Sequence, residues 1–230
     1  IEAVRALRLG ECDVALCGGV GADVDPFTLA GFGLLGALSA RGLSRPFDVH
    51  RDGFVLGEGA AMAVLCADDG PALAEVGGVG RTQDAFHITA PEPSGERAAQ
   101  AMSLALREAG LAEVGYVQAH GTSTPLNDEV EARALQRVLG DALARTPVSS
   151  VKGALGHTIA ASGALGLLCA VEAVRTGTVL PTTGLQEPDP ACALSHVRGR
   201  AVSRDVPSAL CNAFAFGGAN CSLLVRRRDS

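Results

Sequence analysis

Two histidines and one lysine carry the side chains best suited to catalysis in this chain. His120 opens the segment HGTSTP, and His157 lies in SSVKGALGHTIAASG, five residues after Lys152. Lys152 is the only lysine among 19 basic residues, so the other 18 are arginines. A lone ammonium beside a histidine indicates a site that needs a compact, tunable cation, because arginine serves wherever a fixed charge is enough. Chance placement of the lysine on the surface is the alternative.

His120 ends the short apolar run YVQAH, which predicts a strand. A histidine at a strand end can face a pocket, or it can be satisfied by backbone hydrogen bonds in the turn that follows. Asp128 is expected to begin the next helix, with Glu131 three residues later. This spacing fits a capping box. Alternatively, one of these carboxylates turns inward to pair with Lys152, which would be a costly charge if buried alone.

His157 is expected at or near the start of a helix rich in alanine and glycine. The helix dipole opposes protonation of an imidazole at that position. A neutral imidazole can donate one hydrogen bond to a substrate carbonyl, so the position suits an electrophilic role. Packing of the ring in a core is the alternative.

A third segment, NAFAFGGAN, places Gly217 and Gly218 directly after Phe216. Paired glycines let the backbone approach a ligand closely, and backbone N–H groups in such a turn can stabilise an oxyanion. A plain glycine hairpin is the alternative.

Other motif matches fail on their context. The glycines of GFGLLG fit a dinucleotide-binding pattern but lie inside a predicted helix with no strand directly before it. His50, Arg51 and Asp52 resemble a kinase catalytic triplet but lack the accompanying kinase motifs. The five histidines show no metal-ligand spacing. We therefore predict neither a metal nor a cofactor.

The composition predicts a soluble, cytoplasmic protein, with 47% apolar residues, 19% charged residues and a net charge of −6. No basic cluster precedes the terminal Arg226-Arg227-Arg228, which argues against a nucleic-acid partner. Seven cysteines without CxxC spacing indicate buried thiols in a reducing compartment. The most apolar stretch, residues 164–174, is too short to cross a bilayer and no signal peptide opens the chain, so no membrane partner is expected.

Alternating strands and helices must hold these segments in place, which predicts a layered α/β fold. Residues 1–10 form an amphipathic helix with no cap before it, so we expect the chain to begin inside an element. A helix is expected from Pro26 with Asp25 as its N-cap, and another to stop at Gly110. The remaining expected elements are two buried strands, CDVALCGGV and AAMAVLCA, strands at 74–85, 116–120 and 147–152, helices at 127–140 and 158–177, and a closing hairpin at 209–227.

Four segments, in this order, resemble the motifs of the β-ketoacyl-acyl carrier protein synthases, which are condensing enzymes of the thiolase fold. SRPFDVHRDGFVLGEGAA is similar to the family's RDGF-x-x-GEGA segment, and AHGTSTPLND to its first histidine motif. SSVKGALGHT is similar to the lysine and second histidine motif, and NAFAFGGAN to the closing glycine loop. The resemblance implies an incomplete thiolase-like fold. Residues 1–75 would end the N-terminal half, and residues 76–230 would form the C-terminal half.

The resemblance also implies a role for each candidate residue. His120 and His157 would be the catalytic histidines, and Lys152 and Glu131 their supporting ion pair. Phe216 would be the gate near the acyl pocket, and its backbone N–H would serve an oxyanion. The residues expected to bind substrate, gate the pocket or form an oxyanion hole are Phe216, Gly217, Gly218, Thr122 and Thr124.

The implied reaction is a decarboxylative condensation in fatty-acid, polyketide or polyene synthesis. A cysteine takes an acyl group from acyl carrier protein, malonyl carrier loses carbon dioxide, and the resulting carbanion attacks the acyl thioester. The two histidines would stabilise the enolate oxygen. Acyl carrier protein is the expected partner, and a homodimer or a synthase heterodimer the expected assembly.

The chain departs from the family's pattern in two respects. The nucleophilic cysteine of the family lies in a CSSG-type turn before the first helix, and none of the seven cysteines stands in that context. The chain alone is therefore expected to be inactive in condensation, and to be poorly soluble or unfolded. The alternatives are a chain-length-factor-like subunit and a partner that only decarboxylates. Ala215 and Ala219 also replace residues that are glycine and threonine in many relatives, which affects the mobility of the gating loop.

Overall fold

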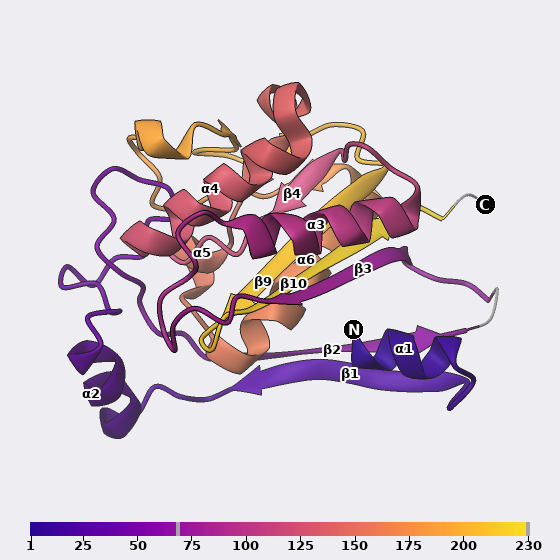
Figure 1. Ribbon diagram of the computed structural model, residues 1–230, viewed down its shortest axis with the longest axis horizontal. Helices are drawn as coiled ribbons and strands as arrows, with labels where there is room; N and C mark the ends of the chain where they lie inside the picture. The colour runs from indigo at the N-terminus through magenta and orange to yellow at the C-terminus, as the bar shows by residue number, and fades with distance from the viewer. Residues whose placement is uncertain (68–69, 229–230) are drawn as a thin grey trace.

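The computed structural model describes residues 1–67 and 70–228, and a six-stranded sheet lies at its centre (Figure 1). The strand order is β3-β10-β9-β4-β5-β7. β4 is parallel to β9 and β5, and β5 is parallel to β7, whereas β10 is antiparallel to β9 and β3. The strands are β3 (Glu75–Gln83), β4 (Tyr116–Gln118), β5 (Pro147–Ser149), β7 (Ser195–His196), β9 (Ser208–Ala215) and β10 (Ala219–Arg226).

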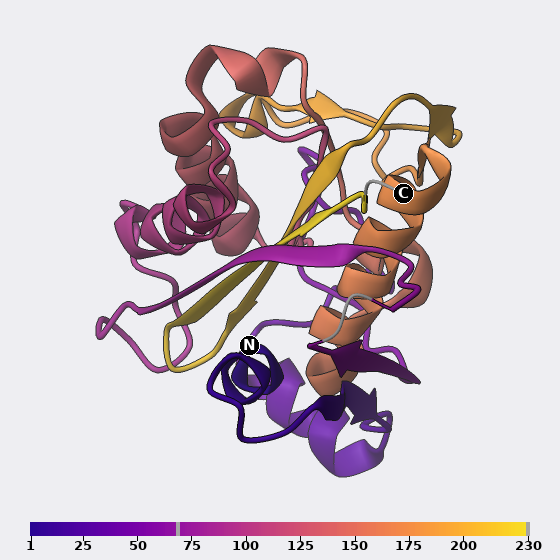
Figure 2. The same cartoon turned by 90° about the vertical axis from the view of Figure 1, so that its right-hand side faces the viewer.

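Helices cover both faces of this sheet, with α3 and α4 on one side and α6 on the other (Figure 2). Successive strand residues point to opposite faces, so β9 serves both layers. Leu210 packs in the core under α3 and α4, and Cys211 in the core under α6. The helices are α3 (Glu96–Ala109), α4 (Pro125–Leu139), α5 (Lys152–Leu155) and α6 (Ser162–Thr176), with short 3₁₀ helices η1 (Gly140–Ala144), η2 (Ile159–Ala161) and η3 (Pro190–Cys192). The predicted layered α/β fold is confirmed.

A separate antiparallel ribbon of β1 (Val14–Gly21) and β2 (Gly59–Cys66) packs against α6. Both strands were expected to be buried, and this expectation is wrong. Leu16 is 68% exposed and its cross-strand partner Val64 is 63% exposed. The reason is that α6 covers only the opposite face of the ribbon, where Ala61 is buried. The other elements are α1 (Glu2–Arg8), α2 (Pro26–Leu34) and the small pair β6 (Thr178–Val179) and β8 (Val202–Ser203).

Local sequence signals place several element ends correctly. The Asp25 carboxylate accepts hydrogen bonds from the N–H groups of Phe27 and Thr28, at 2.8 and 3.1 Å, as the predicted N-cap of α2. α3 ends at Gly110, whose φ of 69° is left-handed. β9 and β10 form the predicted hairpin. These ends follow from side chains adjacent in sequence, so they can be read without the tertiary structure.

One helical stretch in the described part of the chain, Ile159–Thr176, is long and apolar enough to cross a membrane by length and composition. It exceeds the apolar stretch considered above because η2 leads directly into α6. In the structure α6 packs against β9 and β4 of the main sheet and against β1 and β2 of the ribbon. The helix therefore forms the layer between the two sheets.

Candidate active site

The backbone of His120, which follows β4, is held from two sides. The N–H groups of His120 and Gly121 each donate to the Glu131 carboxylate at 2.8 Å. The carbonyl oxygen of His120 accepts a hydrogen bond from Nζ of Lys152 at 2.5 Å. Glu131 has no exposed surface, and Lys152 is buried as well. The histidine loop is thus fixed between a buried carboxylate and a buried ammonium.

The capping-box interpretation of Asp128 and Glu131 is wrong. α4 begins at Pro125 with Thr124 in the N-cap position, so Asp128 already lies in the first turn of the helix. Its carboxylate is fully buried and accepts a hydrogen bond from the N–H of Phe47 at 2.8 Å. Because the helix starts earlier than expected, Glu131 lies deeper in α4, where its carboxylate reaches the His120 loop.

Lys152 and Glu131 do not form the predicted direct ion pair. Within the described residues, Nζ of Lys152 has no carboxylate partner and instead contacts the carbonyl oxygen and Nδ1 of His120. Burial lowers the pKa of Lys152 to about 8, although attraction to the Glu131 carboxylate acts in the opposite direction and raises it. Burial raises the pKa of Glu131, and the hydrogen bonds that its carboxylate accepts from N–H groups partly oppose this rise. The two charges therefore act on the same loop from opposite sides.

The imidazole of His120 lies edge-on to that of His157, with 5.7 Å between ring centres. Nδ1 of His120 is 3.4 Å from Nζ of Lys152. A protonated lysine can only donate, so Nδ1 is an acceptor and the ring proton is assigned to Nε2. Burial, and then the charge of Lys152, hold the pKa of His120 well below its usual value. The ring is neutral at physiological pH.

His157 lies between α5 and η2, close to the start of the α6 layer as predicted. Its N–H donates to the carbonyl of Val55 at 2.8 Å, and its ring centre is 4.8 Å from that of Phe54. Nδ1 is 3.1 Å from the N–H nitrogen of Ile159, which again makes Nδ1 an acceptor. Burial, and then the charge of Lys152, lower the pKa of His157 to about 3. Both histidines are neutral donors through Nε2.

The backbone N–H groups of the turn after β9 differ in whether they have a hydrogen-bond partner. The N–H of Gly217 donates to the carbonyl of Ile88 at 2.6 Å, and that of Gly218 to the carbonyl of Ala215 at 3.1 Å. These two N–H groups are engaged, so the prediction that they serve an oxyanion is wrong. The N–H of Phe216 has no protein partner within the described residues. The Phe216 side chain is 49% exposed, with its ring 6.1 Å from that of Phe32 on α2.

Thr122 and Thr124 lie together directly after His120, with 2.8 Å between their hydroxyl oxygens. Arg51 holds this loop by donating to the carbonyls of Thr124 and Pro125, at 3.4 and 3.1 Å. Its guanidinium also pairs with Asp189. Sequence reasoning set Arg51 aside as part of a coincidental kinase-like triplet. The structure instead makes Arg51 an anchor of the loop that carries His120.

Two further residues behind the site were not among the predicted site residues, although one of them, Asn212, opens the NAFAFGGAN segment. The side-chain amide of Asn212 on β9 donates to Glu131 Oε1 at 3.1 Å, and the hydroxyl of Ser222 on β10 donates to Asn212 Oδ1 at 2.8 Å. Both side chains are buried. Their partners are brought together only by sheet pairing, which places Ser222 opposite Asn212.

None of the buried thiols is activated. Cys211 and Cys192 are buried, and burial raises the pKa of each to about 12. Burial also raises the pKa of Cys169 and Cys221. Thiols in such surroundings stay protonated and are poor nucleophiles. Within residues 1–67 and 70–228, no group of three His, Cys, Asp or Glu residues could hold a metal ion.

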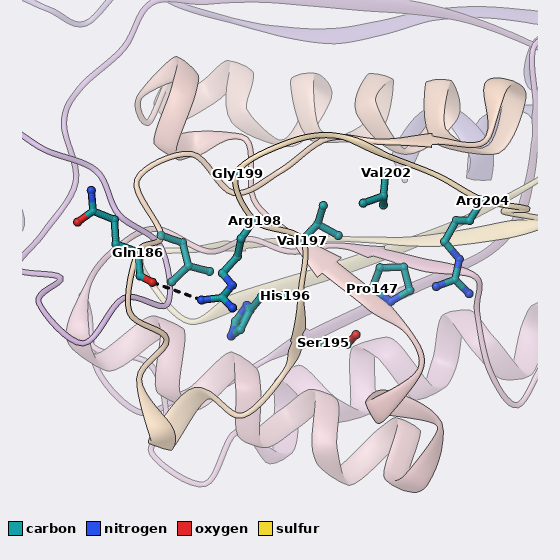
Figure 3. Close-up of a pocket in the computed structure, with 10 residues that line it drawn as sticks. Pro147, Gln186, Ser195, His196, Val197, Arg198, Gly199, Val202 and Arg204 are labelled. Atoms are coloured by element: carbon teal, nitrogen blue, oxygen red, sulfur yellow. Dashed lines mark hydrogen bonds between the residues drawn. The ribbon is translucent and has the colours of Figure 1, made fainter.

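An open groove of about 690 Å³ has neither His120 nor His157 in its lining (Figure 3). It lies between the start of β5 at Pro147 and the segment that carries β7 and β8. Arg198 lines it and donates to the backbone carbonyl of Gln186 at 3.3 Å. His120 and His157, by contrast, follow the carboxyl ends of β4 and β5. The groove therefore takes no part in the histidine site.

The geometry at the histidines suits one kind of chemistry. Two neutral imidazoles lie in edge-to-face contact, and within the described residues neither Nε2 has a protein partner. Two imidazole N–H donors can stabilise the oxygen of a thioester as it gains negative charge, in the manner of an oxyanion hole. In the part of the chain that the structure describes, neither ring is hydrogen-bonded to a carboxylate or thiolate, the partner that would make a histidine a strong base.

Models of two domains match the chain, the β-ketoacyl synthase N-terminal domain over residues 1–69 and the β-ketoacyl synthase C-terminal domain over residues 73–186. The 3-oxoacyl-acyl-carrier-protein synthase 2 of Synechocystis is 40% identical over 98% of this chain and 58% of its own length. The enzyme of the same name from Rhizobium meliloti is 40% identical over 98% of this chain and 57% of its own length. The chain thus spans a little over half the length of these curated relatives.

Solved structures similar to this chain are ketosynthases too, in agreement with the matches to the two domain models. A type II PKS acyl-carrier protein complex with its ketosynthase, bound to the hexaketide, matches with a TM-score of 0.95 and 30% identity over 99% of this chain and 59% of the other. A β-ketoacyl synthase from Burkholderia phymatum matches with a TM-score of 0.93 and 38% identity over 99% of this chain and 58% of the other. The fold is accordingly thiolase-like.

Proposed function

This chain belongs to the β-ketoacyl synthase family, and on that premise we propose that it supplies the histidine pair of a decarboxylating condensing enzyme. The substrates are malonyl and acyl groups carried as thioesters on acyl carrier protein. The observation that supports this proposal most strongly is the pair of neutral imidazoles of His120 and His157, each with Nδ1 engaged as an acceptor and Nε2 open.

In the decarboxylation step, the bond between the malonyl carboxylate carbon and the methylene carbon breaks. Carbon dioxide leaves, and the electron pair passes into an enolate whose thioester oxygen becomes negative. The Nε2–H groups of His120 and His157 donate hydrogen bonds to that oxygen. These bonds strengthen as charge develops, so they lower the barrier more than they tighten ground-state binding.

In the condensation step, the enolate carbon attacks the carbonyl carbon of the acyl thioester, and the thiolate that carried the acyl group leaves. The N–H of Phe216 stabilises the oxyanion of the tetrahedral intermediate, and the Phe216 side chain gates the acyl pocket. Thr122 and Thr124 bind the substrate through their adjacent hydroxyls. Gly217 and Gly218 provide the turn that presents Phe216, as their φ angles of 81° and 79° are left-handed.

The nucleophile that carries the acyl group is not one of the seven cysteines in this sequence. For four of the seven, burial supports this assignment, because it raises the pKa values of Cys169, Cys192, Cys211 and Cys221. For the other three, the support is the absence of a CSSG-type turn around them. The 230 residues alone would then decarboxylate malonyl carrier at most. We retain acyl carrier protein and a second synthase subunit, identical or different, as the proposed partners. A division near residue 75 into two thiolase-like parts, and a cytoplasmic location, stay predictions.

A carrier-based assay separates condensation from decarboxylation alone. The protein that contains these residues is incubated with malonyl carrier, with and without acyl carrier, and the carrier species are identified by mass spectrometry. A condensing enzyme yields 3-oxoacyl carrier when both substrates are present. A decarboxylase-only partner yields acetyl carrier in both cases. Neither product would form if the histidine pair has no decarboxylation chemistry, and the proposal would then be abandoned.

A further inference from the structure

The hydroxyl of Ser162, the first residue of α6, lies 3.0 Å from Nδ1 of His157. The same oxygen is 3.1 Å from the backbone nitrogen of Thr158 and 3.1 Å from the Thr158 hydroxyl. Both His157 and Ser162 are partly buried, and Thr158 is buried. Three polar groups therefore converge on one serine oxygen beside the histidine, on the side of the ring away from the open Nε2.

One arrangement of protons satisfies every contact in this cluster, with the single lone pair of Nδ1 shared between two donors. The amide of Ile159 can only donate, so Nδ1 of His157 carries no proton. The contact between Nδ1 and Ser162 must then use the serine proton. The two lone pairs of the serine oxygen accept from the N–H and the hydroxyl of Thr158. All the hydrogen-bonding capacity of the Ser162 hydroxyl is used.

The backbone at Ile159 supports the same assignment. Ile159 has a φ of 46°, in the left-handed region that β-branched residues rarely adopt. A disfavoured conformation persists where the surrounding structure holds it in place, and such residues cluster at functional sites. Here the consequence is that the Ile159 N–H reaches back to the ring two residues earlier. Nδ1 thus receives two donors, one from a constrained backbone and one from a side chain.

We propose that Ser162 is a positioning residue that holds His157 as the Nε2–H tautomer and fixes its ring orientation. Lys152 holds His120 in the same tautomer, because the ammonium faces Nδ1 of His120. The two histidines thus reach the same tautomer by different means, one through a charged donor and one through a hydroxyl and an amide. This inference rests on the proposed function only for its effect on rate, because the tautomer itself can be observed directly.

The test uses the complete protein labelled with ¹⁵N at histidine, compared with Ser162→Ala. Loss of a hydroxyl donor is expected to move the Nδ1 resonance of His157 and to change its tautomer ratio by about fivefold, the effect of one ordinary hydrogen bond. Malonyl-carrier decarboxylation is expected to show a kcat lower by a similar factor and an unchanged KM. An Nδ1 resonance that stays in place in Ser162→Ala would overturn the proposal.

Two further variants make the result specific. Ser162→Thr keeps the hydroxyl and is expected to restore both the resonance and kcat. Thr158→Val removes the neighbouring hydroxyl but leaves Ser162 free to donate, so the His157 resonance should stay unperturbed. A change in Thr158→Val as large as that in Ser162→Ala would show general loosening and contradict the proposal. If Ser162→Ala moves the resonance but no decarboxylation occurs in any variant, Ser162 still positions His157 and the proposed function fails.

Discussion

Lys152 donates to the carbonyl oxygen of His120, at 2.5 Å, and not to the carboxylate of Glu131. Glu131 in turn accepts from the N–H of His120 on the other side of that residue. The lysine and the glutamate are therefore linked through the catalytic loop itself. Removing either charge should disturb the loop before it disturbs the rest of the fold.

Lys152→Met should lower the rate of malonyl-carrier decarboxylation by about tenfold to a hundredfold, as expected for loss of a hydrogen bond to a charged group. Methionine fills similar space but cannot donate to the carbonyl or to Nδ1 of His120. The fold should survive, which circular dichroism can verify. A fully active Lys152→Met would show that neither contact matters for the histidine.

Glu131→Gln should destabilise the protein by about 1–3 kcal/mol. The reason is that the NH₂ group of glutamine cannot accept a hydrogen bond, whereas both carboxylate oxygens of Glu131 accept one from a backbone N–H. Urea unfolding measures the change. Glu129→Gln is the matched control on the same helix, since Glu129 is half-exposed and pairs with Arg133. It should shift stability by less than about 0.5 kcal/mol. Equal effects of the two substitutions would contradict the buried role of Glu131.

Stability should fall as the pH decreases from about 6.5 toward 3, because the pKa of His157 is about 3 when folded and about 6.5 when unfolded. In that range the unfolded chain binds more protons than the folded one. The stabilising contribution is complete above about 6.5 and is lost as the pH falls. Urea unfolding at several pH values should show that the free energy of unfolding decreases less with falling pH in His157→Gln than in the wild type. The same slope in both would mean that His157 is not buried in its neutral form.

Phe216→Ala should change which acyl chains are accepted, or the rate of acyl transfer, with little effect on malonyl decarboxylation. The Phe216 ring lies 6.1 Å from that of Phe32, which in turn lies 5.5 Å from the ring of Phe54, the aromatic neighbour of His157. Phe27→Ala is the control, because Phe27 lies on the same helix as Phe32 but is 88% exposed. An unchanged acyl-chain profile and transfer rate in Phe216→Ala would remove its gating role.

The sequence predicts what depends on neighbours along the chain. Asp25 caps α2, Gly110 ends α3, and the glycines after Phe216 form a hairpin, because each signal lies within a few residues of its effect. It fails where distant elements decide the outcome. Arg51 binds the carbonyls of Thr124 and Pro125 from more than 70 residues away, a contact that no local signal indicates. The start of α4 itself carries a local signal that the prediction missed, because Thr124 takes the N-cap position and Pro125 the first helical position.

The candidate site shows the same division. Motif spacing identified His120, His157, Lys152 and Glu131, and the structure brings these four together. Motif spacing did not reveal which atoms are in contact, so the prediction of a direct ion pair between Lys152 and Glu131 was wrong. The hydrogen-bond chain from Ser222 through Asn212 to Glu131 depends on cross-strand register, which no short motif encodes.

The most direct test compares decarboxylation of malonyl carrier by the complete protein with that of His120→Ala and His157→Ala. Each loss of an imidazole donor should lower kcat by about a hundredfold to a thousandfold, the usual effect of removing one oxyanion donor. His50→Ala, which changes an exposed histidine paired with Glu187, should keep full activity. Wild-type rates in either His120→Ala or His157→Ala would contradict the central claim that the two histidines together stabilise the enolate.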